Sequence, residues 1–183
     1  MASRDAQPLL WLDMEMTGLD PETCVPIEIA IVVTDAELTE LDVAHAVIHQ
    51  PEEQLATMIE VVREMHTANG LLDKVRAATT SLAQADALVA EVVARQFSRP
   101  AVLAGNSIHT DRRFVMRYFP QLEARLHYRM VDVSSFKEVV RRWYGEAALY
   151  PKPESDHTAV ADARASIAEL AFYRKTFMVP VEA

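Results

Sequence analysis

Two acids near the start of the chain, Asp13 and Glu15, interrupt an otherwise apolar run from Leu9 to Met16. The run is short and ends at turn-forming residues, so it predicts a buried strand. Side chains two residues apart in a strand emerge from the same face, and two buried carboxylates side by side repel each other unless a cation holds them. Their hard oxygen atoms suit Mg²⁺ or Mn²⁺. One interpretation is therefore a metal site, and the other is a harmless pair of surface acids.

The D-x-E spacing of this first pair does not by itself distinguish the two interpretations. The same spacing occurs at Asp20/Glu22 and at Asp35/Glu37. Those pairs lie in polar, turn-like surroundings, where solvated acids are ordinary. The apolar residues on both sides of the first pair are what favour a site there.

Further candidates lie later in the chain. Asp111 follows an apolar stretch and a glycine-containing break, in the loop or first turn of a predicted helix, where an acid commonly serves only the helix N-terminus. The His157-x4-Asp162 pair lies near the start of the last predicted helix, where both side chains could equally be exposed. His127 and Asp132 have the same spacing, but they bracket a predicted strand, and five residues along a strand bring side chains to opposite faces.

The elements that must position these residues alternate between strands and helices. Apolar and β-branched runs predict strands at 9–16, 27–34, 44–49, 101–104 and 128–133, the first three pairing antiparallel. Helical periodicity predicts helices at 54–64, 71–77, 81–96, 108–118 and 158–177, and one more from a Ser135 cap to Tyr144. A Ser81-x-x-Gln84 capping box opens the third of these helices. The pattern is typical of an α/β fold with a mixed sheet.

The composition is that of a globular protein, with 50% hydrophobic and 25% charged residues among 183. We expect one domain over 1–183, because no low-complexity segment, repeat or linker divides the chain. The lone cysteine, Cys24, excludes an intrachain disulfide framework, and the early acids do not suit a signal peptide, so we expect a cytoplasmic setting. No apolar run approaches the roughly 20 residues that span a bilayer, so we expect no membrane partner.

The formal net charge of −9 limits the partners further. Binding a long duplex non-specifically requires many phosphates to be neutralised by Lys and Arg, so a long-duplex partner is excluded. Acids that hold divalent cations add to the charge of the metal-free chain, and a substrate of a few nucleotides needs few phosphate contacts. The acidity therefore limits substrate length more than substrate class.

Four segments taken together resemble a known family: DMEMTGLDP, GNSIHTDRRF, HYRMVDVSSFKE and the His157-x4-Asp162 pair. They closely resemble the oligoribonucleases of the DEDDh exonuclease superfamily, and the resemblance covers almost the whole chain. It implies a ribonuclease-H-like α/β fold, in which helices flank a mixed five-stranded sheet. It also implies two divalent cations, Mg²⁺ or Mn²⁺, with His157 as the general base. The implied metal-binding carboxylates are Asp13, Glu15, Asp111 and Asp162.

The resemblance also implies a homodimer and a set of substrate contacts. In this family a Tyr-Arg pair is thought to reach the partner's site and to meet the terminal phosphate, and we count the tyrosine, Tyr128, among the catalytic residues. A closed end to the groove would exclude longer chains, which explains short substrates. Ordinary packing is the alternative for each side chain. Met16 and Leu19 are expected to pack against bases, and the further expected contacts are His66, Ser107, Tyr128 and Arg129.

The implied activity is 3′-to-5′ hydrolysis of short single-stranded RNA, of about two to five nucleotides and including dinucleotides, to 5′-mononucleotides. One alternative is a related DEDDh exonuclease that acts on tRNA or DNA 3′ ends, and another is a non-catalytic nucleic-acid-binding or scaffold protein. Enzymes for tRNA or DNA ends generally carry basic patches for a longer partner, which this acidic chain lacks. A scaffold has no use for four convergent carboxylates and a histidine.

Overall fold

The computed structural model describes residues 7–151 and 158–179. Its centre is a five-stranded sheet of β1 (Leu9–Met16), β2 (Pro26–Thr34), β3 (Glu40–Val47), β4 (Ala101–Gly105) and β5 (Leu126–Asp132). The strand order is β3-β2-β1-β4-β5. The first three strands pair antiparallel, whereas β4 pairs parallel with both β1 and β5. The predicted mixed sheet and the antiparallel pairing of its first three strands are confirmed.

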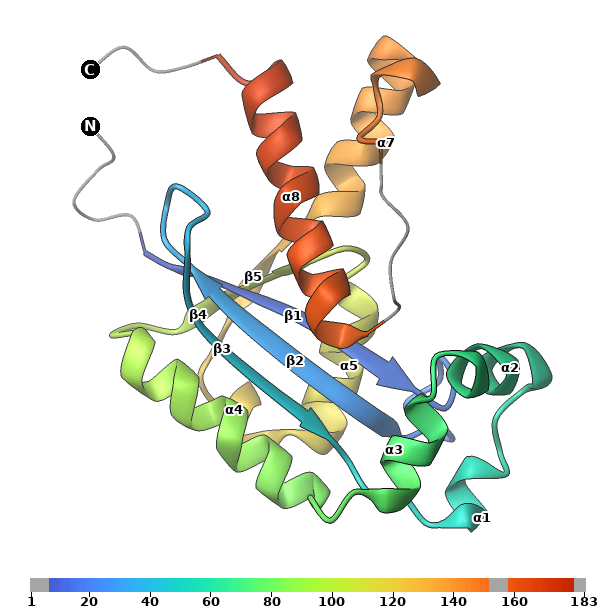
Figure 1. Ribbon diagram of the computed structural model, residues 1–183. Coiled ribbons are helices and arrows are strands. Elements are labelled where there is room, and N and C mark those ends of the chain that lie inside the picture. The colour runs from blue at the N-terminus through green and yellow to red at the C-terminus, as the bar shows by residue number, and fades with distance from the viewer. Residues whose placement is uncertain (1–6, 152–157, 180–183) are drawn as a thin grey trace.

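Helices cover both faces of this sheet. Figure 1 shows α7 and α8 on one face and α4 across the other, with α1, α2 and α3 grouped beyond one end of the long strands. Side chains of α4 and α5 pack in the same apolar cluster, whereas those of α7 and α8 pack in a second cluster. The helices are α1 (Glu52–Leu55), α2 (Glu60–Ala68), α3 (Leu71–Ala77), α4 (Leu82–Gln96), α5 (His109–Tyr118), α6 (Pro120–Glu123), α7 (Val133–Tyr144), the 3-10 helix η1 (Glu146–Ala148) and α8 (Ala159–Phe177).

The alternation of side chains along β1 decides where its acids point. Leu10 and Leu12 belong to the cluster under α4 and α5, whereas Trp11 belongs to the cluster under α7 and α8. Because successive side chains point to opposite faces, Asp13 and Glu15 lie on the same face as Trp11. The acids of β1 therefore face α8.

One predicted helix, over 54–64, is wrong, because the structure divides this segment into α1 and α2. Leu55 and Met58 are both buried in one apolar cluster with residues of α3. The chain is extended at Ile59, with ψ of 153°, and a new helix begins there. The Arg63 guanidinium donates to the carbonyls of Leu55 and Ala56 at 2.9 and 3.2 Å, which satisfies carbonyl groups at the end of α1.

Other boundaries also differ from the prediction, including that of the fifth strand, which spans 126–132 instead of 128–133. The third strand spans 40–47 instead of 44–49, because its pairing with β2 extends to Glu40, and polar residues on an edge strand escape a search for apolar runs. Ser135 does not cap α7; the Asp132 carboxylate accepts the Ser134 N–H at 3.0 Å, so the helix follows β5 directly. The capping box of Ser81 and Gln84 is confirmed. Within the described ranges, no helix is both long and apolar enough to cross a membrane.

Candidate active site

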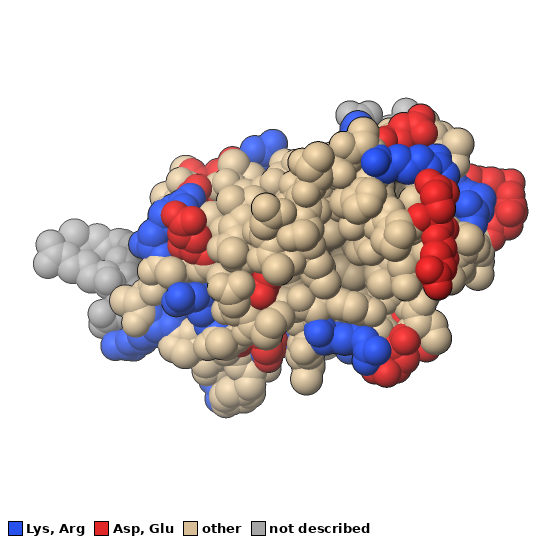
Figure 2. Space-filling model, turned by 90° about the horizontal axis from the view of Figure 1, so that it is seen from below, with Lys and Arg blue, Asp and Glu red and all other residues tan. Residues whose placement is uncertain are grey.

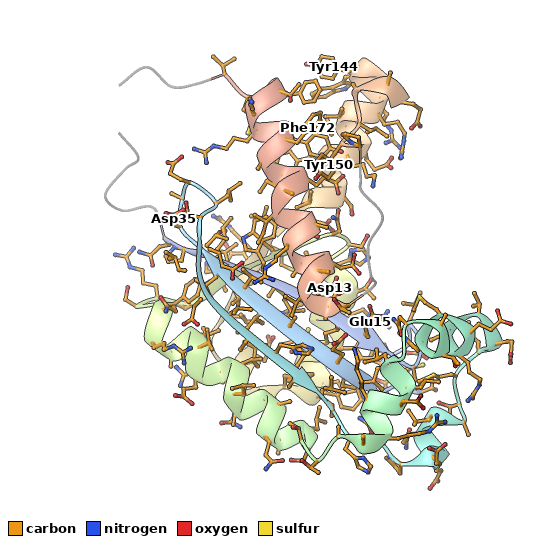
Figure 3. All side chains as sticks on the ribbon, viewed as in Figure 1. Asp13, Glu15, Asp35, Tyr144, Tyr150 and Phe172 are labelled. Carbon is orange, nitrogen blue, oxygen red and sulfur yellow. The ribbon has the colours of Figure 1, made fainter. Side chains whose placement is uncertain are left out.

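Three carboxylates converge where β1 passes beneath the start of α8. Asp13 and Glu15 come from β1, and Asp162 comes from the first turn of α8. One ligand oxygen from each lies within 4.8 Å of the other two. Figure 3 shows Asp13 and Glu15 at the lower end of α8. The structure therefore brings together three of the four carboxylates expected to bind metal.

The fourth carboxylate, Asp111, comes from the first turn of α5 and contacts the backbone of β1. The pairing of β1 with β4 ends at Trp11 and Ala104, so the later N–H groups on this edge of β1 are not paired with β4. The Asp111 Oδ1 atom accepts the N–H of Met14, between the two β1 acids, at 3.1 Å. Asp111 is 7% exposed. Its side chain therefore binds the central strand, in addition to any stabilisation of the N-terminus of α5.

Close backbone approach at Gly105 makes this arrangement possible. A Cβ atom at Gly105 would lie 2.8 Å from the Leu12 carbonyl oxygen and 2.9 Å from the Ile108 Cδ1 atom. Because the nearer atom belongs to the backbone, a side chain there would push β4 away from β1. Asp111, six residues further on, would move with the loop.

Burial and mutual repulsion set the electrostatics of the cluster. Burial, together with the smaller contributions of the charges of Glu28, Asp162 and Asp111, raises the pKa of Glu15 to about 8. Burial also raises the pKa of Asp111 to about 7. Burial, followed by the charges of Asp111 and Glu15, raises the pKa of Asp13 well above its ordinary range. Buried acids that repel one another are stabilised strongly by a nearby cation, and an all-oxygen donor set fits Mg²⁺ or Mn²⁺.

His66 of α2 lies against the same cluster with no exposed surface. Its Nε2 atom is 3.2 Å from the Met16 carbonyl oxygen and 3.8 Å from Glu15 Oε2. Its Nδ1 atom is buried and has no hydrogen-bond partner among the described residues. Burial lowers the pKa of His66, which favours the neutral ring. His66 is therefore a buried side chain rather than a solvated one, which is compatible with ordinary packing, and its contact with a nucleotide stays a prediction.

The other D-x-E pairs are ordinary turn residues, as the sequence indicated. Asp35 accepts the N–H groups of Glu37 and Thr39 at 2.9 and 2.8 Å in the turn between β2 and β3. Figure 3 shows Asp35 at the far end of these strands from Asp13. Asp20 accepts the N–H of Glu22 at 3.1 Å. Local context in the sequence therefore distinguished the pair that lies in a carboxylate cluster from the two pairs that lie in turns.

Three of the expected substrate residues lie at or just after strand ends: Met16 ends β1, Leu19 follows it, and Ser107 follows β4. Leu19 is 72% exposed, so its side chain is available to a base. Met16 is partly buried, and its carbonyl contacts His66. Ser107 is exposed and has a left-handed φ of 48°, which its N–H contacts with Asp132 and Ser134 help to hold.

Tyr128 and Arg129 lie apart from the cluster, on the edge strand β5. Tyr128 is 74% exposed, and its ring stacks on His127 with centroids 4.4 Å apart. The Arg129 guanidinium lies over the Tyr128 ring, 5.4 Å from its centroid. His127 Nδ1 accepts the Arg129 N–H, and Asp132 caps α7, so the second H-x4-D pair forms no site.

Two residues near the site escaped the sequence analysis. The side chain of Arg112, next to Asp111, is only 13% exposed and donates to the His127 carbonyl at 3.0 Å and to Glu123 at 2.7 Å. Glu28 of β2 is 2% exposed and lies opposite Glu15 in the sheet. A lone acid in an apolar strand is the signal that could have found it. His157, the expected general base, lies outside the described residues.

Comparison with known proteins defines the class first. A family model described as exonuclease, RNase T, matches residues 10–170. Exonuclease I from Methylocaldum szegediense superimposes with a TM-score of 0.71 at 18% identity, over 93% of this chain and 41% of the other. Escherichia coli Exonuclease I in complex with a DNA oligonucleotide gives a TM-score of 0.70 at 17% identity, over 94% and 42%. This chain spans less than half of these larger proteins, and the likeness confirms the expected ribonuclease-H-like fold.

Closer relatives then identify the family. An oligoribonuclease of Mycobacterium tuberculosis is 49% identical over 176 residues, covering 94% of this chain and 82% of the relative. Oligoribonucleases of Mycobacterium ulcerans and Mycobacterium avium are 47% and 50% identical over 95% and 93% of this chain, which are 83% and 81% of the relatives. The chain belongs to the oligoribonuclease family, within a class of metal-dependent exonucleases.

Proposed function

We propose that this protein hydrolyses short single-stranded RNA, of about two to five nucleotides, from the 3′ end to 5′-mononucleotides. The convergence of Asp13, Glu15 and Asp162 within 4.8 Å, on a buried strand face, carries this proposal. The names of the relatives agree with it. The acidic chain favours a short substrate, because few cationic side chains remain to hold a long one.

The four carboxylates would hold two divalent cations, Mg²⁺ or Mn²⁺. When bound, such ions stabilise the charge of the scissile phosphate and lower the pKa of a nucleophilic water. The chain supplies rigid ligands: β1 holds Asp13 and Glu15, α8 holds Asp162, and the Met14 N–H orients Asp111. Positioned carboxylates spare the site the cost of ordering its ligands during the reaction.

Hydrolysis also requires a base for the attacking water. The water oxygen forms a bond to phosphorus while the bond from phosphorus to the departing 3′ oxygen breaks. We assign the water's proton to His157, because a neutral imidazole suits proton acceptance near neutral pH. The departing 3′ oxygen takes up a proton, and the released product carries the 5′-phosphate.

We further propose a homodimer in which Tyr128 and Arg129 act in the partner's site. Strand β5 runs parallel to β1 with β4 between them, and the register places Tyr128 near the level of Leu9. Asp13 lies further along β1 and two strands across, on the order of 16 Å away. The Tyr128 side chain does not span this distance within one chain, which supports a contribution from a second copy. Arg129 would bind the terminal phosphate, and Ser107, Leu19, Met16 and His66 would complete the substrate contacts.

Apolar surface on α7, the helix that follows β5, supports such an interface. Trp143 and Tyr144 of α7 are 73% and 57% exposed and line a cavity of about 380 Å³ between α7 and α8. Exposed aromatic groups of this size are typical of surfaces that become buried against another molecule.

We also propose a cytoplasmic location and a single domain over 1–183.

The variant Asp13→Ala tests the metal site. We expect it to fold normally, by circular dichroism, and to lose Mg²⁺- or Mn²⁺-dependent hydrolysis of a dinucleotide by at least about a thousandfold, because the cluster loses a ligand. Glu37→Ala, in a remote D-x-E pair, is the matched control and should retain activity. Unchanged activity of the Asp13→Ala variant would rule out the mechanism.

A series of substrate lengths tests the specificity. End-labelled RNAs of about two, five and twenty nucleotides are incubated with the protein and Mn²⁺, together with DNA oligomers of the same lengths. We expect the shortest RNA to decay fastest. Equal or faster decay of the longest RNA excludes a preference for short substrates, and faster decay of DNA favours the alternative enzyme class.

A further inference from the structure

A buried acid outside the metal cluster lies directly beside it. Glu28 of β2 is paired with Glu15 of β1 in the antiparallel register, and both side chains lie on the face that packs against α8. Glu28 is 2% exposed. It is the charge that contributes most to raising the pKa of Glu15, after burial. An additional acid at this position makes the cluster more repulsive, so its presence needs a compensating role.

Both oxygens of Glu28 are engaged by other elements. Oε1 lies 2.6 Å from Nε2 of His45 on β3. Oε2 accepts the N–H of Ala159, the first residue of α8, at 3.1 Å. Burial raises the pKa of Glu28, but the hydrogen bonds from His45 and Ala159 outweigh burial, and the pKa is lowered overall. The side chain therefore acts as an ionised acceptor whose two oxygens contact His45 and Ala159.

The contact with Ala159 lies at a critical point of α8. The first N–H groups of a helix have no partner within the helix and need an acceptor from elsewhere. Thr158 occupies the N-cap position, yet its side chain makes no capping hydrogen bond. Glu28 supplies the acceptor from the neighbouring sheet, and its negative charge suits the positive end of the helix. Asp162 follows on the first turn of the same helix.

We propose that Glu28 is a positioning residue that caps α8 from β2 and so holds Asp162 within ligand distance of Asp13 and Glu15. This inference rests on the proposed metal site. Asp162 reaches the cluster from a helix, whereas the other two ligands come from the sheet, so the site exists only if helix and sheet keep a fixed relative position. The capping bond joins them one turn or less from the ligand, and His45 fixes the Glu28 carboxylate from the other side.

A second link between sheet and helix provides a matched control. Glu40 of β3 accepts two hydrogen bonds from Arg164 of α8, both at 2.9 Å. Arg164 is two residues beyond Asp162, but this pair is exposed, with 52% and 38% of the two side chains accessible. Exposed pairs contribute little to stability, so the loss of Glu40 should leave the position of Asp162 unchanged.

The experiment measures binding of Mn²⁺ alone, without substrate, by electron paramagnetic resonance or calorimetry. We expect Glu28→Ala to weaken binding about tenfold or more, as removal of groups that orient metal ligands commonly does. Glu28→Gln should recover most of the affinity, because the amide oxygen can still accept the Ala159 N–H. Glu40→Ala should bind within about twofold of wild type.

Four outcomes would overturn the role of Glu28. The first is Mn²⁺ affinity of folded Glu28→Ala within about twofold of wild type, and the second is an equal loss in Glu40→Ala, which would indicate general loosening of α8. The third is a loss in Glu28→Gln as large as in Glu28→Ala. If Glu28→Ala does not fold, hydrogen exchange of the wild-type chain tests the cap instead. The fourth outcome is then an Ala159 amide that is not protected from exchange. Failure of the wild-type protein itself to bind Mn²⁺ would instead refute the metal site, and the exchange measurement would still report on the cap.

Discussion

Buried acids at the centre of the sheet cost the metal-free protein stability. Asp13, Glu15 and Asp111 are removed from water and lie among like charges, so each holds a proton more tightly than in the unfolded chain. A divalent cation takes the place of these protons and of the missing counter-charge. The residues that destabilise the metal-free fold are the ones expected to hold the metal.

The raised pKa values predict how stability depends on pH. Glu15 has a pKa of about 8 and Asp111 of about 7 in the folded protein, against 4.5 and 3.8 ordinarily. Between these limits the folded state binds more protons than the unfolded state, so the free energy of unfolding decreases as pH rises. The lowered pKa of His66 acts in the opposite direction, but its effect is complete above its ordinary value of 6.5. The decrease is therefore expected most clearly from about pH 6.5 to 8.

Thermal unfolding in a chelating buffer measures this decrease. We expect the melting temperature of the metal-free protein to fall by about 3 °C or more across the interval, and Mn²⁺ to restore more of it at the upper pH than at the lower. Glu15→Gln removes the carboxyl group whose pKa is about 8, so its curve should be flatter. A melting temperature that rises across this interval in the wild type would contradict the assignment of buried, protonated acids.

At the scale of single residues, context in the sequence predicted more than spacing did. The apolar neighbours of Asp13 and Glu15 indicated a buried pair without any resemblance, and the same reasoning applied to Glu28 would have found it in the run IEIAIVVT. Asp111 was not predictable in this way, because its contact with the Met14 N–H joins residues far apart in the chain. The role of Asp162 likewise depended on the resemblance, since an acid in a first helical turn is common.

Helix α8 is the element that completes the site, and a buried polar network holds its middle. Asn106, after β4, donates to Ser166 and Glu169 of α8, both at 3.0 Å. Tyr173 donates to Glu169 at 2.9 Å, and burial raises the pKa of this tyrosine to about 12. The loop that leads to Asp111 is therefore tied to the helix that carries Asp162. Satisfied buried networks fix relative positions because a partly broken network is costly.

Helix α5 and the start of β5 are connected by a second tie, which Arg112 provides. The variant Arg112→Ala leaves the Glu123 carboxylate and the His127 carbonyl without their charged donor. We expect the free energy of unfolding, measured with urea, to fall by about 2–3 kcal/mol. Arg113→Ala is the matched control, because this side chain is 55% exposed and its guanidinium lies 3.8 Å from Asp20, beyond hydrogen-bond distance. The loss in its free energy of unfolding should stay within about 0.5 kcal/mol. Equal losses in both variants would show that the buried contacts of Arg112 contribute nothing special.

Most elements were predictable from the sequence, and the errors have physical causes. The run of β1 and the capping box of α4 appear almost unchanged in the structure. The break between α1 and α2 was missed, because Arg63 stabilises it through a side chain eight residues from Leu55. The N-terminus of α7 was misplaced, because Asp132 serves both as the end of a strand and as a cap. Tertiary contacts decided each of these cases.

The face seen in Figure 2 offers little cationic surface to a long nucleic acid. Most of this face is uncharged, and Lys and Arg lie around it in separate groups with Asp and Glu among them. Individual arginines are paired with acids, such as Arg95 with Asp42 and Arg174 with Glu37. Figure 2 shows no continuous row of Lys and Arg, which a long phosphate backbone requires, across this face. The proposed preference for short substrates therefore agrees with the charge distribution of this face.

In a homodimer, the exposed edge strand β5 would form part of the interface. Strand β5 ends the sheet on one side, and its Tyr128 and Met130 side chains are 74% and 38% exposed. Edge strands with exposed apolar side chains are natural sites of association. If Tyr128 contributes to the partner's site, each complete site contains residues from two chains.

Mixing two inactive variants tests this arrangement directly. Asp13→Ala abolishes the site of its own chain but keeps Tyr128, whereas Tyr128→Ala keeps the acids but lacks the tyrosine. In a mixed dimer, the site with intact acids receives Tyr128 from the Asp13→Ala partner, so subunit exchange at equal concentrations should restore about a quarter of wild-type activity. The double variant Asp13→Ala/Tyr128→Ala, mixed with Tyr128→Ala, is the control and should restore none. A strictly monomeric protein by light scattering, or a mixture no more active than its parts, would show that Tyr128 does not act across an interface.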